Sequence, residues 1–446
     1  MSSEKKNLRG YVAFWSGQLV STFGTNVVQF AVTVWIAFAT GSPLMLGYAA
    51  FFAFGTQIAF TPIAGVFVDR WSRKKVIAIS DALQALAALI LIYLFLNGQA
   101  TVWIVIAVLA VRGGLGAFHD MAVQAIIPLM VPDRLLSRMN ALNYFAVNLI
   151  GSIGPLVGAL VFALLGGDLS RILWVDVITF LIAVIPTVIV RIPRVIMERS
   201  SGKKRSFRRD FGAGVSFIRE TKGLTTLLST FAIANFLLTP LGLLLPLFSI
   251  EFVAMGDTAR APILYGILVT LANAGSLVSA LFMSFHKGLK RNVVGVIGGM
   301  LLGATGMLLV ALSPNLGPML SSLTPEGLLW IAAIGMTLNG LTVPIANVSS
   351  QTIWQQVVPP EKLGRVFAVR ITFAQVTVPI AMLFTGYAAT YFGMQFVILL
   401  CAILEILALG AAWTLTTLPH VEDTILAKKL SSQTKLGQKK AKQPDE

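Results

Sequence analysis

The chain alternates between long apolar stretches and short polar gaps. Twelve stretches reach the length of about 20 residues that a helix needs to cross a bilayer core of roughly 30 Å. They cover approximately 11–39, 44–68, 76–96, 102–130, 141–165, 172–190, 224–250, 263–285, 293–312, 328–348, 366–391 and 394–418. Each stretch is continuously apolar, whereas a membrane β-barrel shows short segments of alternating polarity. The pattern therefore predicts twelve transmembrane helices.

The longest internal polar stretch, residues 191–222, divides these spans six and six. This predicts an all-α membrane protein with two six-helix bundles, residues 1–190 and 223–419. A cytoplasmic linker, 191–222, joins them, and a disordered cytoplasmic tail, 420–446, follows. Such a layout is typical of transporters whose substrate site lies between two halves near the bilayer midplane.

Positive charge is distributed unevenly among the gaps. Thirty of the 34 Lys and Arg residues lie in the two termini and in alternate gaps. The exceptions are Arg171 and Arg260 in the other gaps, and Arg112 and Arg370 inside or beside apolar spans. Cationic loops resist translocation, so the basic side and both termini are expected in the cytoplasm, with the protein in the plasma membrane.

Composition supports a membrane protein. Hydrophobic residues make up 56% of the chain, charged residues 12%, and the mean hydropathy is +0.82, unlike a soluble domain. The net charge of +15 comes from loops and a tail, so the expected partner is the lipid bilayer and not nucleic acid. One cysteine, Cys401, and three histidines give no support to metal, cofactor or redox chemistry. The protein is not expected to be an enzyme.

The segment from Gly65 to Val76 resembles the loop signature of the major facilitator superfamily. The matching positions are Gly65, Asp69, Arg70, Arg73 and Lys74. Ser72 departs from the glycine that is usual in the family. Asp69 and Arg73 are four residues apart and are expected to brace a cytoplasmic gate, while Gly65 is expected to permit close helix approach.

Two further segments strengthen this resemblance. Arg112 followed by Gly113 and Gly114 resembles the superfamily's intramembrane Arg with glycines. Residues 151–158 resemble the Gly-Pro signature of drug:proton antiporters, carried by Gly151, Gly154, Pro155 and Gly158, with Ala159 as a departure. That signature favours export, although glycines four apart are also frequent where membrane helices pack closely.

In finer detail the chain resembles the macrolide-efflux branch of the twelve-span drug antiporters. The supporting stretches are residues 15–18, 68–70, 73–75, 116–119, 128–132, 191–193, 222–224 and 363–367. The resemblance implies a monomer with the major facilitator fold that exports an amphipathic small molecule in exchange for protons. Two alternatives stay open: export of an endogenous metabolite such as a siderophore or lipid, and a non-transporting membrane sensor or assembly subunit.

The fourth predicted span holds the candidates for proton coupling. An Arg inside the membrane costs roughly 2.5–3.5 kcal/mol on insertion scales, so Arg112 is expected to face protein or a wet cavity. His119 lies on nearly the same helical face, and Asp120 is the candidate proton carrier, with a fixed ion pair as the alternative. Asp81, Asp176 and Glu405 are expected to serve packing, helix pairing or interfacial solvation, because the third, sixth and twelfth helices usually stand outside the central cavity in this architecture.

Polar side chains inside other spans are the candidates for the substrate cavity. The first span carries a stripe at helical spacing. The family resemblance implies that the first, fourth, seventh and tenth spans face the cavity. The candidates are Gln18, Thr22, Thr25, Asn26, Gln29, Asn235, Thr239, Asn339, Thr342 and Asn347. Hydrogen bonding between helices is an equal alternative for any one of them.

Overall fold

The structure is a computed structural model that describes residues 7–192, 207–285, 291–320, 327–359 and 362–423. Within these residues all regular elements are helical, and twelve helices are long and apolar enough to cross a membrane. The predicted fold class and the twelve spans are therefore confirmed. Most of the predicted tail, residues 424–446, lies outside the described residues.

Thirteen α-helices follow one another along the described chain, and all but α7 belong to the twelve candidate spans. The first six are α1 (Leu8–Thr40), α2 (Pro43–Arg70), α3 (Arg73–Leu96), α4 (Val102–Met130), α5 (Leu136–Leu164) and α6 (Leu169–Ile189). The others are α7 (Phe207–Glu220), α8 (Leu224–Phe248), α9 (Ala261–Phe285), α10 (Asn292–Leu320), α11 (Gly327–Val357), α12 (Leu363–Phe392) and α13 (Met394–Thr414). Short helical turns cover Asp133–Leu135, Ser249–Val253 and Leu418–His420.

Local signals in the sequence set the ends of several spans. The side chain of Asn7 accepts a hydrogen bond from the backbone N–H of Gly10 at the start of α1, and Ser42 caps α2 in the same way. Gly41 and Gly393 end α1 and α12 with φ of +57° and +85°, a conformation that glycine adopts without steric cost. These caps explain why the helices begin and end within a few residues of the apolar stretches.

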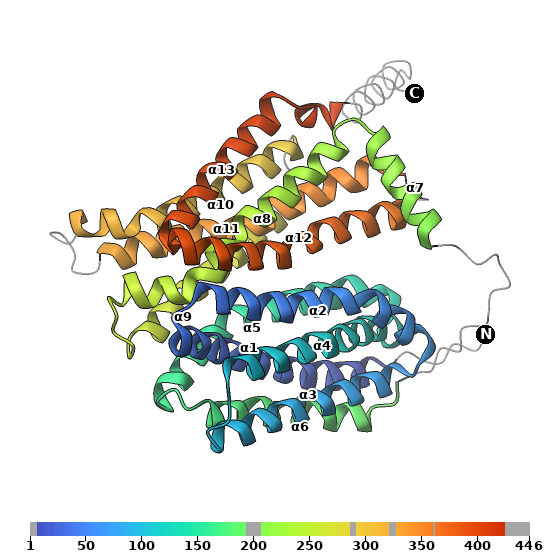
Figure 1. Ribbon diagram of the computed structural model, residues 1–446. Helices are drawn as coiled ribbons and strands as arrows, with labels where there is room; N and C mark the ends of the chain where they lie inside the picture. The colour runs from blue at the N-terminus through green and yellow to red at the C-terminus, as the bar shows by residue number, and fades with distance from the viewer. Residues whose placement is uncertain (1–6, 193–206, 286–290, 321–326, 360–361, 424–446) are drawn as a thin grey trace, which may run out of the picture.

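The helices form two groups that lie against each other (Figure 1). The N-terminal group contains α1–α6, and the C-terminal group contains α8–α13. We call the end of the molecule that holds the start of α1 and the start of α8 the linker end, and the opposite end, where α1 ends and α2 begins, the far end. α2 packs against α12, and α5 against α9, so these four helices join the groups.

The buried apolar side chains connect the two groups at the far end. One cluster there contains Val34 and Leu46 of the N-terminal group together with Leu244 and Phe248 of the C-terminal group. Towards the linker end the buried side chains form two separate clusters. One holds Phe14 and Ile126 and belongs to the N-terminal group, and the other holds Leu227, Val296 and Trp354 and belongs to the C-terminal group. The two groups thus share a core at one end of the molecule.

Specific contacts between the groups extend from the far end to about the middle of the helices. The hydroxyls of Tyr48 and Tyr387 lie 2.6 Å apart, and the Phe30 and Tyr265 rings stack at 4.8 Å. Further towards the middle, the Asn273 amide donates to the backbone oxygen of Gly151 at 3.1 Å. The hydroxyl of Thr270 makes a similar bond, at 3.1 Å, to the carbonyl of Ser152.

Helix α7 falls within the region predicted as a linker. Its residues Phe211, Val215 and Ile218 pack into the linker-end cluster of the C-terminal group, and α7 lies against α12. At the crossing, a Cβ on Gly214 would lie 2.7 Å from the backbone oxygen of Arg365. The apolar residues of α7 recur every three or four positions between charged ones, so α7 is an amphipathic helix and not a continuous apolar stretch of the kind that predicts a span.

Glycine allows α2 and α4 to cross closely, and this gives a test of the packing. A Cβ on Gly113 would lie 2.1 Å from the backbone oxygen of Ala53, whereas the space around Gly65 is open. We expect Gly113→Ala to force the helices apart and to destabilise the protein by about 1–3 kcal/mol. Gly65→Ala, the matched control, is expected to be neutral or slightly stabilising. Thermal unfolding of the purified variants measures the difference, and equal midpoints would contradict this account of the crossing.

Candidate functional site

A cavity of about 310 Å³ lies within the N-terminal group of helices. Side chains of α1, α2, α3, α4 and α6 form its wall. Its polar lining residues are Ser21, Thr22, Thr25, Gln29, Gln57, Gln84, Arg112, His119 and Asp120. Ala53, Phe54, Leu109 and Phe180 add apolar surface. An apolar wall with a few convergent polar groups is the usual form of a small-molecule site.

Arg112 forms an ion pair inside this cavity. Its Nη2 lies 2.5 Å from Oδ2 of Asp176 on α6, and the two side chains are 10% and 0% exposed. The other carboxylate oxygen of Asp176 accepts a hydrogen bond from the Thr25 hydroxyl at 3.2 Å. The guanidinium also lies 5.9 Å from the ring centre of Phe180. The expectation that Arg112 faces protein and a cavity is confirmed, and its partner links α1, α4 and α6.

His119 is the centre of a second cluster. Its Nε2 lies 2.9 Å from the side-chain oxygen of Gln18 and 3.3 Å from Oδ1 of Asp81, while its Nδ1 lies 3.3 Å from Oδ1 of Asp120. A neutral imidazole has one N–H donor, but acceptor oxygens surround both nitrogens here. The arrangement therefore suits the protonated ring, which donates from both sides.

The two carboxyl groups beside His119 differ in their access to water. The Asp120 side chain is 49% exposed and accepts a hydrogen bond from the Gln57 amide at 3.1 Å. Asp81 is fully buried, and its carboxyl group lies beside both His119 and the Gln18 side chain. The cluster thus links an exposed acid, a base and a buried acid. Such a set can accept a proton at the exposed acid, Asp120, and thereby change the charge that the buried acid, Asp81, faces.

Asp81 and Asp176 are the residues whose functional position was not predicted. Both were expected to serve packing or helix pairing, and Asp176 does pair helices. Its partner, however, is Arg112, and Asp81 contacts His119, so both carboxyl groups belong to the candidate site. The available signal was the cost of an acidic group in an apolar span, which requires a partner whatever helix carries it.

The polar stripe of the first span divides into two sets. Thr22, Thr25 and Gln29 line the cavity of the N-terminal group, and their role in a substrate cavity between the two groups stays a prediction. Gln18 is instead buried, where its amide donates to the Thr187 hydroxyl at 3.2 Å and its oxygen faces His119. The Asn26 amide donates to the backbone oxygen of Thr22 at 2.8 Å. Gln18 therefore positions His119, and Asn26 bonds within its own helix.

The candidates in the C-terminal group do not line this cavity. The Asn235 amide donates to the backbone oxygen of Ala374 at 3.2 Å, and Thr239 bonds to the carbonyl of Asn235 at 2.6 Å. Thr342 is buried against Gly303 of α10. Asn339 is half-buried, and Asn347 is exposed. The structure does not bring these residues together with the stripe on α1, so their cavity role stays a prediction.

The predicted gating loop between α2 and α3 is described in part. Lys74 donates to the backbone oxygens of Val188 and Val190 at 2.5 and 3.0 Å, which places a cation at the C-terminal end of α6. Arg73 is half-buried. The side chains of Asp69 and Arg70 lie outside the described residues, so the Asp69–Arg73 contact stays a prediction.

In the conformation described, no atom lies within 4 Å of the position of a Cβ on Gly65, so close helix approach at this glycine stays a prediction. The physical reason for the open space is that the buried side chains of the two groups form separate clusters towards the linker end, the part of the molecule to which this loop belongs.

Two helices, α1 and α9, pack against the Gly-Pro segment of α5. A Cβ on Gly154 would lie 2.8 Å from the Cβ of Asn26, and one on Gly158 would lie 3.0 Å from the backbone oxygen of Val27, both on α1. On the C-terminal group, a Cβ on Gly266 of α9 would lie 3.3 Å from the carbonyl of Pro155. Gly151 has open space and accepts the bond from Asn273. The segment lies where the N-terminal group meets the other group.

The part of the chain that the structure describes has twelve apolar helices in two groups, with charged and polar side chains converging on a cavity, which is the architecture of a multi-pass membrane protein. The sequence profile of the Major Facilitator Superfamily matches residues 14–336 and 303–443. The chain belongs to this superfamily, and it is a transporter of small molecules and not an enzyme.

The chain is similar to two curated efflux proteins. It is 28% identical to Macrolide efflux protein A of Streptococcus pyogenes over 393 residues. The aligned region covers 86% of this chain and 90% of that protein. It is 28% identical over 378 residues to the multidrug efflux pump Tap of Mycolicibacterium fortuitum, with 83% and 86% covered. Among solved structures, a bacterial homologue of the human lysosomal transporter Spinster, inward-facing and occupied, matches with a TM-score of 0.69 and 13% identity, over 92% of this chain and 97% of that one. That likeness shows the fold.

The Arg112–Asp176 pair gives a test of the site. We expect Asp176→Ala to destabilise the protein by about 3–5 kcal/mol, because it leaves the Arg112 guanidinium buried without its partner. The double variant Arg112→Met with Asp176→Leu is expected to recover most of that loss, since neither charge remains. Thermal unfolding in lipid nanodiscs measures both effects. A double variant as unstable as Asp176→Ala would show that the pair is not the source of the loss.

Proposed function

We propose that this transporter exports amphipathic small molecules, drugs or macrolide-like compounds, in exchange for protons. The similarity to efflux proteins supports the direction of transport. The observation that carries the proposal is the polar cavity, in which two ionisable clusters face a partly apolar wall. Arg112 and Asp176 form the fixed pair, and His119 with its two acids forms the titratable set.

In this mechanism Asp120 receives the proton, because it is the acid of the cluster that reaches the cavity and is exposed. Protonation of Asp120 removes one of the two negative charges beside His119 and leaves the ring facing Asp81. The substrate occupies the space beside Thr22, Thr25 and Gln29 after Asp120 has released this proton to the cytoplasm, so that proton and substrate are carried in turn and in opposite directions. Arg112 and His119 keep their roles as coupling residues, since both lie between the cavity and a buried carboxylate.

We further propose that the linker end faces the cytoplasm of a plasma-membrane protein that works as a monomer. The basic residues of the alternate gaps support this orientation. With the linker end inside, the shared apolar core closes the outer side, and the separate clusters leave the two groups apart on the inner side. This is the geometry expected of an inward-open state. The two-bundle domain division predicted from the sequence is part of the same proposal.

Proton coupling can be tested by measuring the uptake of radiolabelled erythromycin into energised inverted membrane vesicles. We expect uptake into the vesicles to collapse when a protonophore is added. Asp120→Asn is expected to lower the uptake to that of vesicles without the protein, because the variant has no titratable group at this position. Asp168→Asn is the matched control. Asp168 lies at the far end of α6, where hydrogen bonds from Ser170 lower its pKa and an asparagine still caps the helix.

Two outcomes would contradict different parts of this proposal. Uptake that persists with the protonophore would exclude proton coupling, and normal uptake by Asp120→Asn would exclude Asp120 as the carrier. Erythromycin that is not transported by any variant, while another amphipathic drug is, would leave the coupling residues in place and change the substrate.

The far-end closure can be tested through the Tyr48 and Tyr387 contact. In a Cys401→Ser background, we expect the variant Tyr48→Cys with Tyr387→Cys to be bridged through two disulfides by a short bis-methanethiosulfonate reagent, because the two side chains meet across the groups. The bridge is expected to abolish transport, since the outer side must then open, and a reductant should restore it. Each single-cysteine variant, treated with the same reagent, is the control. Full transport by the bridged protein would contradict alternating opening at this end.

A further inference from the structure

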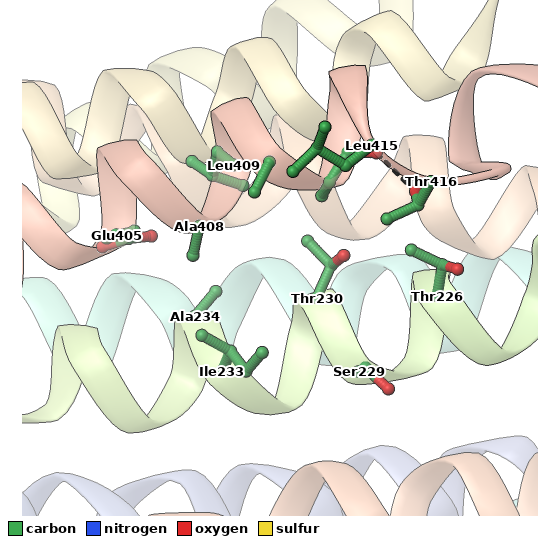
Figure 2. A pocket seen from close by; sticks show the side chains of 12 residues that line it. Thr226, Ser229, Thr230, Ile233, Ala234, Glu405, Ala408, Leu409, Leu415 and Thr416 are labelled. Carbon is green, nitrogen blue, oxygen red and sulfur yellow. Dashed lines mark hydrogen bonds between the residues drawn. The ribbon is translucent and has the colours of Figure 1, made fainter.

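A second cavity, of about 440 Å³, lies between α8 and α13 in the C-terminal group (Figure 2). Its volume lies within the usual range of small-molecule sites. Ala234 and Leu409 form part of its apolar wall, while the hydroxyls of Thr226 and Thr416 lie near the end where α8 begins. None of its lining residues belongs to the polar cavity of the N-terminal group.

One ionisable group lines this apolar cavity. Glu405 lies about midway along α13, and its side chain is fully buried. Neither of its carboxyl oxygens has a hydrogen-bond partner among the residues that the structure describes. Figure 2 shows Glu405 at the end of the cavity that is away from Thr416, next to Ala408. A carboxyl group without a partner in a low-dielectric site is costly, so the site favours a ligand that brings a donor or a positive charge.

The position of the cavity indicates how a ligand reaches it. Ile233 on its wall is 46% exposed, and Leu415 at its edge is 81% exposed. Both side chains belong to spans or span ends, so the cavity opens onto the apolar surface of the candidate spans. A molecule dissolved in the bilayer can therefore enter between α8 and α13 without passing through the polar cavity.

We propose that this cavity binds a lipophilic amine, with its cationic nitrogen at Glu405 and its apolar body between α8 and α13. Charge complementarity selects this class: a fatty acid would bring a second negative charge, and an acyl chain would bring no donor. A phospholipid is a poor match as well, because its head group stays at the membrane interface and Glu405 lies deeper in the span. Glu405 is the twelfth of the 21 residues of α13, about 14 Å from its C-terminal end. The inference concerns binding and does not depend on the proposed export.

The test uses the full chain in phosphatidylcholine nanodiscs with a dodecylamine that carries a photoreactive diazirine on its alkyl chain. Its N-acetyl analogue has the same apolar body without the charge. We expect the amine to label peptides of α8 and α13 and the analogue to label them far less. Glu405→Gln keeps the shape of the side chain and removes its charge, so labelling by the amine should fall about tenfold or more.

A pair of variants on α13 tests the cavity itself. Ala408→Phe places a ring in the cavity and should block labelling, whereas Leu407→Phe is the matched control, because Leu407 is 62% exposed and does not line the cavity. Thermal unfolding confirms that each variant is folded. Equal labelling by the amine and its N-acetyl analogue would overturn the proposal. Labelling unchanged by both Glu405→Gln and Ala408→Phe, or confined to the N-terminal cavity, would also overturn it. Erythromycin transport is measured separately, so its failure would leave this result intact.

Discussion

A charged group inside an apolar span must find a partner within the protein, and the Arg112–Asp176 pair is where this constraint acts most strongly. Neither side chain reaches water freely, since they are 10% and 0% exposed. Lipid offers no hydrogen bonds, so breaking the pair would strand a charge. The Thr25 hydroxyl donates a hydrogen bond to the other carboxylate oxygen of Asp176. Together with this bond, the ion pair fixes the rotation of α1, α4 and α6 about their axes. That rotation determines which side chains face the cavity, including His119 about two turns further along α4.

The fold was predictable because its signals are local. A continuous apolar stretch of about 20 residues specifies a spanning helix without reference to its neighbours, and caps such as Gly41 and Gly393 end helices within a residue or two. Helix α7 was missed because its apolar side chains cover one face only, where Val215 and Ile218 pack beside α12. A helix of this kind is visible in the periodicity of the sequence, but its partner is not.

The site was predictable in its residue types and less so in its contacts. Arg112, His119 and Asp120 were identified because charge in an apolar span demands an explanation. Their partners depend on how helices far apart in the chain are rotated and spaced, which no local pattern specifies. The close approach at Gly154 brings α5 onto α1 at Asn26, and packing of this kind decides which side chains can meet. Asp81 was assigned a packing role from the usual position of its helix, while the burial that brings it to His119 is a property of the assembled bundle.

The contacts between the two groups are of the kind that a moving interface requires. The far-end core is apolar, and apolar contacts have no fixed direction, so the groups can separate without leaving a charge unpaired. The polar contacts at this interface, such as Asn273 with the carbonyl of Gly151, are neutral hydrogen bonds, and in membrane proteins these contribute roughly 0.6 kcal/mol each. The ion pair and the His119 cluster lie wholly within the N-terminal group. Rocking of one group against the other would thus keep both clusters intact, and a change of charge inside one group would alter its surface towards the other without disturbing its fold.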